Sequence, residues 1–268
     1  MKYRFLEERH IHQIFKDDKW QNLTGCTTIL SVLAKPALIQ WAADEAVSQL
    51  GWIKEDYYVD DIKVERTEEE RLEVAKRGID KIMTLDTKGY LELLDNARVA
   101  HCRKKEKAGI FGKNTHAEIE KLIKGAITLG GYVRNAKSEI PAVQNFIKWA
   151  ADNKVKFLES EKHIYSEKHF LGGVVDFVCE IEERVWLGDI KTAKSGIYPE
   201  NFAQMSGYQI MLNEMNLYPD ILGYIVLNLK ENGKMAEKRS ISNENNINFF
   251  LSCLTIYREQ ERIKGQTL

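Results

Sequence analysis

The chain has 268 residues, with 39 lysines and arginines against 40 aspartates and glutamates, so its formal net charge is -1. At 44% hydrophobic and 29% charged residues, the composition is that of an ordinary globular protein and excludes a disordered chain. The balanced charge also excludes a uniformly basic nucleic-acid coat, but not a local basic groove. The length suits one large domain, or a core with a helical addition.

The four cysteines, Cys26, Cys102, Cys179 and Cys253, lie far apart in the sequence. They form neither a CxxC pair nor a disulfide framework, so we expect free thiols in a reducing compartment. The N-terminal segment is charged throughout, unlike a signal peptide. The apolar stretch Ile221–Leu229 is too short to cross a bilayer. We therefore expect a cytoplasmic protein with no membrane partner.

Residues 1–110 are predicted to be mainly helical. The predicted helices cover Thr28–Leu50, with a second start at Pro36, then a stretch from Thr67 to about Met83, and about Lys88–Lys107. Thr67 and Glu70 have the spacing of a capping box, which marks a helix start. Between these helices, Gly51–Val64 is aromatic and acidic, and we expect a loop or small insertion there.

Residues 111–268 are predicted to form the core of a single domain spanning 1–268. Thr115 with Glu118 is a second possible capping box, and Ser138 with Pro141 opens a further helix. The predicted strands and later helices are Val155–Ser166, Phe170–Glu180, Arg184–Lys191, the helix Pro199–Met215, Ile221–Leu229, Lys234–Ile241 and the helix Asn243–Lys264. This order predicts an α/β (α+β) fold with helices flanking one mixed central β-sheet.

Two aspartates are expected to face each other in this sheet. If the hairpin is symmetric about Glu182 and Glu183, Asp176 lies directly opposite Asp189, with Cβ atoms ~5 Å apart. Lys191 shares that face because side chains alternate along a strand. Two facing carboxylates repel each other unless one is protonated or a cation lies between them.

This arrangement suits a hard divalent cation such as Mg²⁺, which takes oxygen ligands. A metal-bound water is easier to deprotonate, and Lys191 could orient that water or stabilise charge developing on phosphorus. The residues thus outline a phosphodiester-cleavage site. On spacing alone the alternative is simpler: strand-end carboxylates in water, one of them paired with Lys191.

Further candidates lie on neighbouring elements. Glu159 and Glu161 are both on the preceding β segment, and we prefer Glu161 because it follows the apolar run. His116 shares a helical face with Ile119 and Ile123, so it is either a ligand or a hydrogen-bonded core residue. A third pair, Gln204 and Tyr208, lies four residues apart on the helix after Lys191; it either contacts nucleic acid or forms an ordinary polar face.

Taken in order, GGVVD ending at Asp176, GDIKT around Asp189, and QMSGY from Gln204 to Tyr208 resemble the PD-(D/E)XK nuclease superfamily. Within that superfamily, the QxxxY spacing and Gly112-Lys-Asn-Thr-His116 are similar to the RecB-type exonuclease branch. The segments Thr27–Leu30 and Lys35–Trp41 resemble the entry segment of phage exonucleases and of the mitochondrial genome maintenance exonuclease. The resemblance covers about Thr27–Leu50 and Gly112–Leu229.

The resemblance implies a restriction-endonuclease-like core and one or two Mg²⁺ or Mn²⁺ ions. The implied metal ligands are His116, Asp176, Asp189 and the backbone carbonyl of Ile190. Lys191 would be the catalytic lysine and Glu161 the upstream acid, with Glu159 competing for that role. Gln204 and Tyr208 would orient the active site and the DNA strand. Some relatives hold an iron–sulfur cluster with three clustered cysteines after the core, where this chain has only Cys253, so we expect no cluster.

The function expected from these residues is a metal-dependent DNA exonuclease, in phage or bacterial DNA recombination or repair. Lys104 and Lys105, in the basic run Arg103–Lys107, either line a DNA channel or form a solvated helix end. Two alternatives stay open: an endonuclease of the same superfamily, or a nucleic-acid-binding module without catalysis. Relatives form ring-shaped assemblies, so the resemblance also allows a homo-oligomer.

Overall fold

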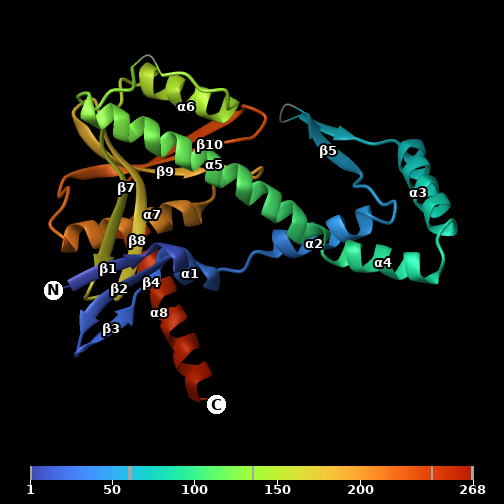
Figure 1. Cartoon of the computed structure of the whole chain (residues 1–268), viewed down its shortest axis with the longest axis horizontal. Helices are drawn as coiled ribbons and strands as arrows, with labels where there is room; N and C mark the ends of the chain where they lie inside the picture. Colours follow the sequence, from blue (N-terminus) through green and yellow to red (C-terminus); the bar gives the residue numbers. More distant parts are fainter. Residues whose placement is uncertain (1, 60–61, 135, 243, 267–268) are drawn as a thin grey trace. The chain divides into compact units, whose positions relative to one another are not determined.

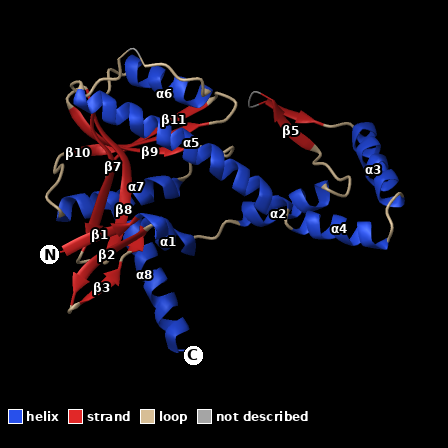
Figure 2. Ribbon diagram, viewed as in Figure 1, coloured by secondary structure: helices blue, strands red, loops and turns tan. Residues whose placement is uncertain are grey.

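A computed structural model describes residues 2–59, 62–134, 136–242 and 244–266 (Figure 1). The chain divides into two compact units: unit 1 comprises Met1–Leu33 and Phe111–Leu268, and unit 2 comprises Ala34–Ile110. We expected residues 1–110 to belong together as one helical part; instead, the residues up to Leu33 fold with the core. The predicted fold class, a mixed central sheet flanked by helices, is confirmed (Figure 2).

Unit 1 is built on a six-stranded sheet of order β11-β10-β9-β8-β4, with β7 also paired to β8. The strands are β4 (Thr24–Gly25), β7 (Lys156–Ser166), β8 (Leu171–Ile181), β9 (Arg184–Lys191), β10 (Ile221–Leu229) and β11 (Met235–Ile241). The pairs β9–β10 and β4–β8 are parallel, and the other neighbours are antiparallel. All five strands predicted from the sequence after residue 150 are present.

Helices cover both faces of this sheet, because its central strands carry apolar side chains on both sides. On one face lie α5 (Ala100–Thr128) and α6 (Pro141–Asp152), which bury Ile119 and Phe146 against Phe177 of β8. On the other face lie α7 (Pro199–Glu214) and α8 (Glu244–Gln266), which bury Met211 and Phe250 against Leu187 of β9. The short helices α1 (Cys26–Ile29) and η2 (Leu30–Val32) join this second layer.

The N-terminal segment forms a second, three-stranded antiparallel sheet that the sequence analysis did not predict. It consists of β1 (Lys2–Leu6), β2 (Ile11–Lys16) and β3 (Lys19–Asn22), with the one-turn helix η1 (Glu7–Arg9) between the first two strands. Its tight turn uses Asp17 and Asp18, both with positive φ. The sheet packs on β7 and β8: the Tyr3 ring stacks on Tyr165 at 4.6 Å, and a Cβ on Gly172 would lie 2.4 Å from His12 Cβ.

Unit 2 consists of helices and one hairpin, followed by the first part of α5. Its elements are α2 (Pro36–Ser48), β5 (Asp56–Val59), β6 (Ile62–Glu65), α3 (Glu68–Met83) and α4 (Thr87–Arg98). The predicted capping box at Thr67 and Glu70 is confirmed, with both reciprocal hydrogen bonds present. The stretch expected to be a loop or insertion forms the β5–β6 hairpin instead; residues 60–61 lie outside the described residues.

Two helix predictions are wrong. The helix expected over Lys88–Lys107 is interrupted at Val99, where α4 ends and α5 follows. The second capping box is absent from the described structure, because Thr115 and Glu118 both lie inside α5 and Thr115 is fully buried. The spacing of Thr115 and Glu118 suggested a helix start there, but packing of the long helix on the sheet overrides that local preference. The start predicted for the last helix, Asn243, lies outside the described residues.

Among the described residues, no single helix is both long and apolar enough to cross a bilayer; the bent pair Cys26–Val32 and Pro36–Ser48 passes by length and composition only.

Gly188 should be intolerant of a side chain. It pairs with Phe177 across β8 and β9, and a Cβ there would lie 1.9 Å from two atoms of the Phe177 ring. We expect Gly188→Ala to lower the free energy of unfolding by ~1–3 kcal/mol through overpacking. The control Gly196→Ala has open space and should change it by less than ~0.5 kcal/mol. Urea midpoints at equal m-value measure both; equal midpoints would contradict the packing argument.

Candidate active site and metal centre

The candidate site lies where β8 and β9 separate. The ladder between them ends at the pair Phe177–Gly188, and the next residues outward are Asp176 and Asp189. This is the register predicted from the sequence. Beyond it the ladder stops: the backbone N–H of Ile190 donates to Asp176 Oδ2 at 2.6 Å, in place of a strand partner. Among the residues that the structure describes, the same edge of β8 pairs again at its start, with β4, and the strand edge between these two pairings has no strand partner.

Glu161 reaches this opening from β7. It lies between the pairs Ser160–Phe177 and Lys162–Val175, so the register places it opposite Asp176. Its φ of 48° is in the left-handed region, which a glutamate seldom adopts inside a strand. Such strain persists only where the surroundings enforce it, and it is concentrated at functional sites. Here the irregular backbone interrupts side-chain alternation beside Asp176.

His116 completes this group from α5. Its Nδ1 lies 3.9 Å from Asp176 Oδ2, and its side chain is about one-third exposed at 32%. One turn earlier, a Cβ on Gly112 would lie 2.8 Å from Thr192 Oγ1, so the glycine lets α5 lie close to the end of β9. His116, Glu161 and Asp176 each offer a ligand atom, and these atoms all lie within 4.8 Å of one another. The three side chains therefore form a group that can hold a metal ion.

The structure places Glu161, and not Glu159, in this group. Glu159 is the first paired residue after the register shift in β7 and lies opposite Val178. Its carboxylate accepts a hydrogen bond from Lys162 Nζ at 2.8 Å. It also accepts one from the Tyr218 hydroxyl at 3.2 Å. For Glu161, burial first, and then the charges of Asp176 and Glu120, raise the pKa to about 7, although the charge of Lys124 acts in the opposite direction.

A second group, centred on Asp189, adjoins the first. Lys191 Nζ donates to Asp189 Oδ1 at 2.8 Å and lies 2.7 Å from Asp189 Oδ2, which receives no hydrogen bond. Gln204 Nε2 bridges Asp189 Oδ1 at 3.3 Å and the Tyr208 hydroxyl at 2.7 Å. Gln204 Oε1 in turn accepts from Lys191 Nζ at 3.3 Å. Asp189, Lys191, Gln204 and Tyr208 therefore form one hydrogen-bonded network.

Burial dominates the electrostatics of this network. Asp189 is 2% exposed, and desolvation raises its pKa to about 6 even though Lys191 acts in the opposite direction. Desolvation alone would lower the pKa of Lys191, but the charges of Asp189 and Asp176 outweigh it and raise that pKa. Burial also raises the pKa of Tyr208 well above its usual value. The ammonium group thus stays protonated and fixed beside Asp189.

The remaining sequence candidates lie in different places. The Ile190 side chain is buried, and its backbone N–H already serves Asp176. Gln204 and Tyr208 are 7% and 8% exposed, so both act inside the network. Lys104 and Lys105 belong to unit 2, where Lys104 forms an ion pair with Glu45 and Lys105 is exposed.

Two polar residues near the site had no role in the sequence analysis. Glu120 lies one turn after His116 on α5 and forms an ion pair with Lys124. Asn228 is fully buried in β10, in register beside Lys191, and its Nδ2 donates to Ser195 O at 2.5 Å. This bond fixes the loop that follows Lys191. The sequence did offer a signal for Asn228, because it is a polar residue inside the apolar run Ile221–Leu229.

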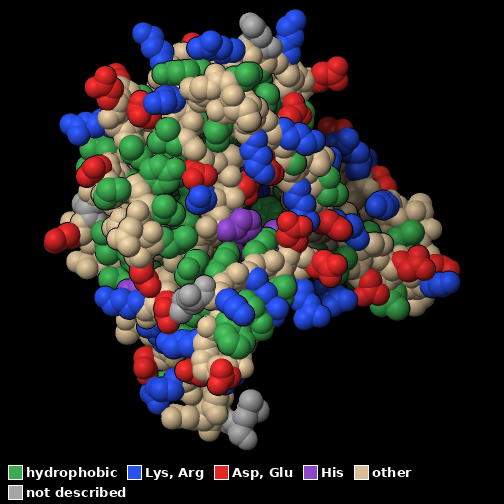
Figure 3. Space-filling view, turned by 60° about the vertical axis from the view of Figure 1, so that its left-hand side comes forward, with side chains coloured by type: hydrophobic (Ala, Val, Ile, Leu, Met, Phe, Trp, Pro, Cys, Tyr) green, Lys and Arg blue, Asp and Glu red, His purple; other side chains and the backbone are tan. Residues whose placement is uncertain are grey.

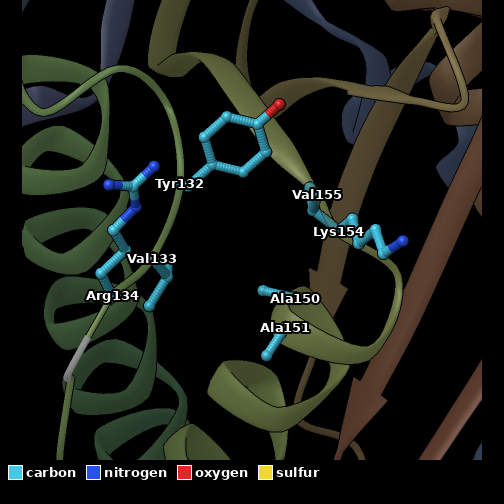
Figure 4. Close-up of a pocket in the computed structure, with 7 residues that line it drawn as sticks. All are labelled: Tyr132, Val133, Arg134, Ala150, Ala151, Lys154 and Val155. Atoms are coloured by element: carbon cyan, nitrogen blue, oxygen red, sulfur yellow. The ribbon is translucent and has the colours of Figure 1, made fainter.

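The pocket found among the described residues lies away from the candidate site. On the face shown in Figure 3, basic and acidic side chains are intermixed, with histidine near the centre. A pocket of about 380 Å³ is lined by Tyr132, Arg134, Lys154 and Val155, among others, between the ends of α5 and α6 (Figure 4). None of the candidate catalytic residues lines it, so we assign it no part in the chemistry.

Comparison of the sequence with protein-family models and with curated proteins gave no match. Functional inference therefore rests on the geometry of the two adjoining groups.

The raised pKa of Glu161 predicts a pH-dependent stability. Its carboxyl keeps a proton in the folded state up to about pH 7, whereas the usual value is 4.5. The resulting stabilisation is fully present below the unfolded-state pKa and is lost as the pH rises through the folded-state value. In EDTA, we expect the Tm of the wild type to fall between pH 5 and pH 8 more steeply than that of Glu161→Gln. Glu159→Gln should retain the wild-type slope; parallel curves for all three proteins would contradict the assignment.

Proposed function

We propose that this protein is a Mg²⁺- or Mn²⁺-dependent nuclease that hydrolyses DNA phosphodiester bonds, acting from strand ends. The observation that carries the proposal is the convergence of His116, Glu161 and Asp176 beside the Asp189–Lys191 pair, at the open edge of β8. Oxygen-rich ligand sets with one imidazole accept hard divalent cations. A bound cation would polarise the phosphate and lower the pKa of an attacking water.

The protein's own side chains supply the remaining parts of the chemistry. Lys191 is held by Asp189 and Gln204, so its positive charge is already fixed in position when negative charge would develop on the phosphate oxygens. Asp176 is held by the Ile190 N–H, which leaves its other oxygen available as a ligand. Glu161 offers a carboxylate oxygen to the same group as His116 and Asp176, and it would bind a cation in its deprotonated form. Tyr208, through Gln204, keeps the network rigid.

DNA is the proposed substrate, and two sets of residues favour it. The order of Asp176, Asp189, Lys191, Gln204 and Tyr208 is similar to that of RecB-type exonucleases. Lys105 is an exposed cation on α5, the helix that also carries His116, and Lys104 beside it forms an ion pair with Glu45, whose side chain is mostly buried. Cations of this kind bind the phosphate backbone by releasing counterions, independent of sequence.

Substitutions in the network test the catalytic proposal. On end-labelled linear DNA with Mg²⁺ or Mn²⁺, Asp189→Asn and Lys191→Ala should lower the cleavage rate by ~10²–10³-fold or more, because transition-state charge loses its fixed partner. Glu161→Gln should be similarly impaired. The matched control Glu159→Gln should retain activity near that of the wild type, since its carboxylate serves Lys162 and Tyr218. Wild-type cleavage no faster than that of Asp189→Asn would overturn the proposal and favour a non-catalytic binding module.

Closed circular DNA tests whether cleavage needs an end. We expect linear single-stranded or duplex DNA to be degraded to short products, while circles of the same sequence stay intact over the same time. Gel analysis after linearising part of the circular sample gives an internal control for enzyme quality. Cutting of intact circles at a comparable rate would instead identify an endonuclease built on the same residues.

A further inference from the structure

Unit 2 buries little apolar surface of its own. Among its described residues, the buried hydrophobic side chains are only Leu93, Ala97 and Ala100. Large apolar side chains are instead exposed along α3, where Leu72, Ile79 and Met83 are 61%, 59% and 79% exposed. Small folding units are stabilised mainly by the apolar area they bury, so a unit of this kind gains by association.

The orientation of α3 is fixed by a close backbone contact. A Cβ on Gly78 would lie 2.6 Å from Gly51 Cα, and Gly51 itself has a φ of +95°. The Gly78 face of α3 therefore faces the rest of unit 2. Leu72, Ile79 and Met83 follow one another at spacings of seven and four residues, so they form one stripe on a helix. That stripe is exposed because it is not on the Gly78 face.

The charges of α3 are divided between its two halves. The first half carries Glu68, Glu69, Glu70 and Glu73 against one cation, Arg71, and the second half carries Lys76, Arg77 and Lys81 against one carboxylate, Asp80. The two halves therefore have net charges of −3 and +2. The helix dipole accounts for such a bias only within the first and last turns. It does not account for Glu73 and Lys76 in the interior, nor for the apolar stripe. An antiparallel pair of α3 helices would place each acidic half opposite a basic half.

We propose that α3 is a self-association surface, on which a second copy of this chain docks its own α3 in antiparallel orientation about a two-fold axis. The contact is isologous: the same apolar stripe is buried on both copies, and unlike charges flank it. A helix of 16 residues is only ~24 Å long, so the contact is smaller than a standard interface of ~1,600 Å². The dimer is therefore a weak one, with a Kd on the order of micromolar. This inference does not depend on the proposed nuclease activity.

Sedimentation velocity of the full chain tests the stripe. From about 1 μM to about 100 μM, we expect a shift from monomer to dimer. Leu72→Glu should weaken the dimer at least ~10-fold by placing a charge in the apolar contact. Ile256→Glu is the matched control, because Ile256 is 50% exposed on α8, outside the proposed surface, and its dimerisation should be unchanged. Circular dichroism checks that both variants are folded.

Charge reversal tests the antiparallel pairing. Glu69→Lys with Glu73→Lys should abolish the dimer, because lysines then face the basic half of the other copy. Adding Lys76→Glu and Arg77→Glu should restore it, since both halves are then reversed together and the i,i+4 pair of residues 73 and 77 is kept. A wild type that stays monomeric throughout, a dimer indifferent to Leu72→Glu, or a fourfold variant no better than the twofold one would each overturn the proposal.

Discussion

Three carboxylates gather at the open edge of β8, and their mutual repulsion is the constraint on which the rest of unit 1 depends. Each is accommodated differently. Asp189 is paired with Lys191 and held by Gln204. Asp176 receives the Ile190 N–H, which is free because the ladder has ended. The cation nearest in effect to Glu161, Lys124, is paired with Glu120, and the pKa of Glu161 rises to about 7. Charge placed in apolar surroundings persists only with a partner, and here the partners come from both layers of helices and from the backbone.

Two glycines near the site allow helices to lie close to the sheet and bring these side chains together. A Cβ on Gly173 would lie 2.8 Å from the Tyr208 ring, so the glycine lets α7 approach β8 and bring Gln204 to Asp189. On the other face, Gly112 brings α5 and His116 against the end of β9. Both helices are thus drawn toward the point where β8 and β9 separate. The site is held by close backbone packing in addition to hydrogen bonds, and this suits a set of groups that must keep fixed mutual distances.

The parts of the site that were predictable from sequence are those whose geometry is set by residues close together in the chain. The pairing of Asp176 with Asp189 follows from one short turn, and the contact of Gln204 with Tyr208 follows from helical spacing. The preference for Glu161 over Glu159 agrees with the group found in the structure. The register shift between Phe157 and Glu159, which sets the pairing of β7 with β8 and so places Glu161 opposite Asp176, was not predictable. The continuity of α5 was missed because tertiary packing, not local preference, decides it. The sheet β1–β3 was missed because its strands are rich in charged side chains and are stabilised by contacts with distant residues such as Tyr165.

The proton on Glu161 and a divalent cation are alternative answers to the same repulsion. The pKa of the Glu161 carboxyl lies at about 7, first because the side chain is partly buried and then because Asp176 and Glu120 lie nearby. A cation bound by His116, Glu161 and Asp176 would take the place of the proton, because ligands bind metals in their deprotonated form. Ion binding should then release a proton and become tighter as the pH rises through 7. Ion binding should change the protonation of Asp189 less, since Lys191 already balances its charge. The two adjoining groups therefore differ in their response: Glu161 in the first group is arranged to exchange its proton, and Lys191 in the second keeps a fixed positive charge beside Asp189.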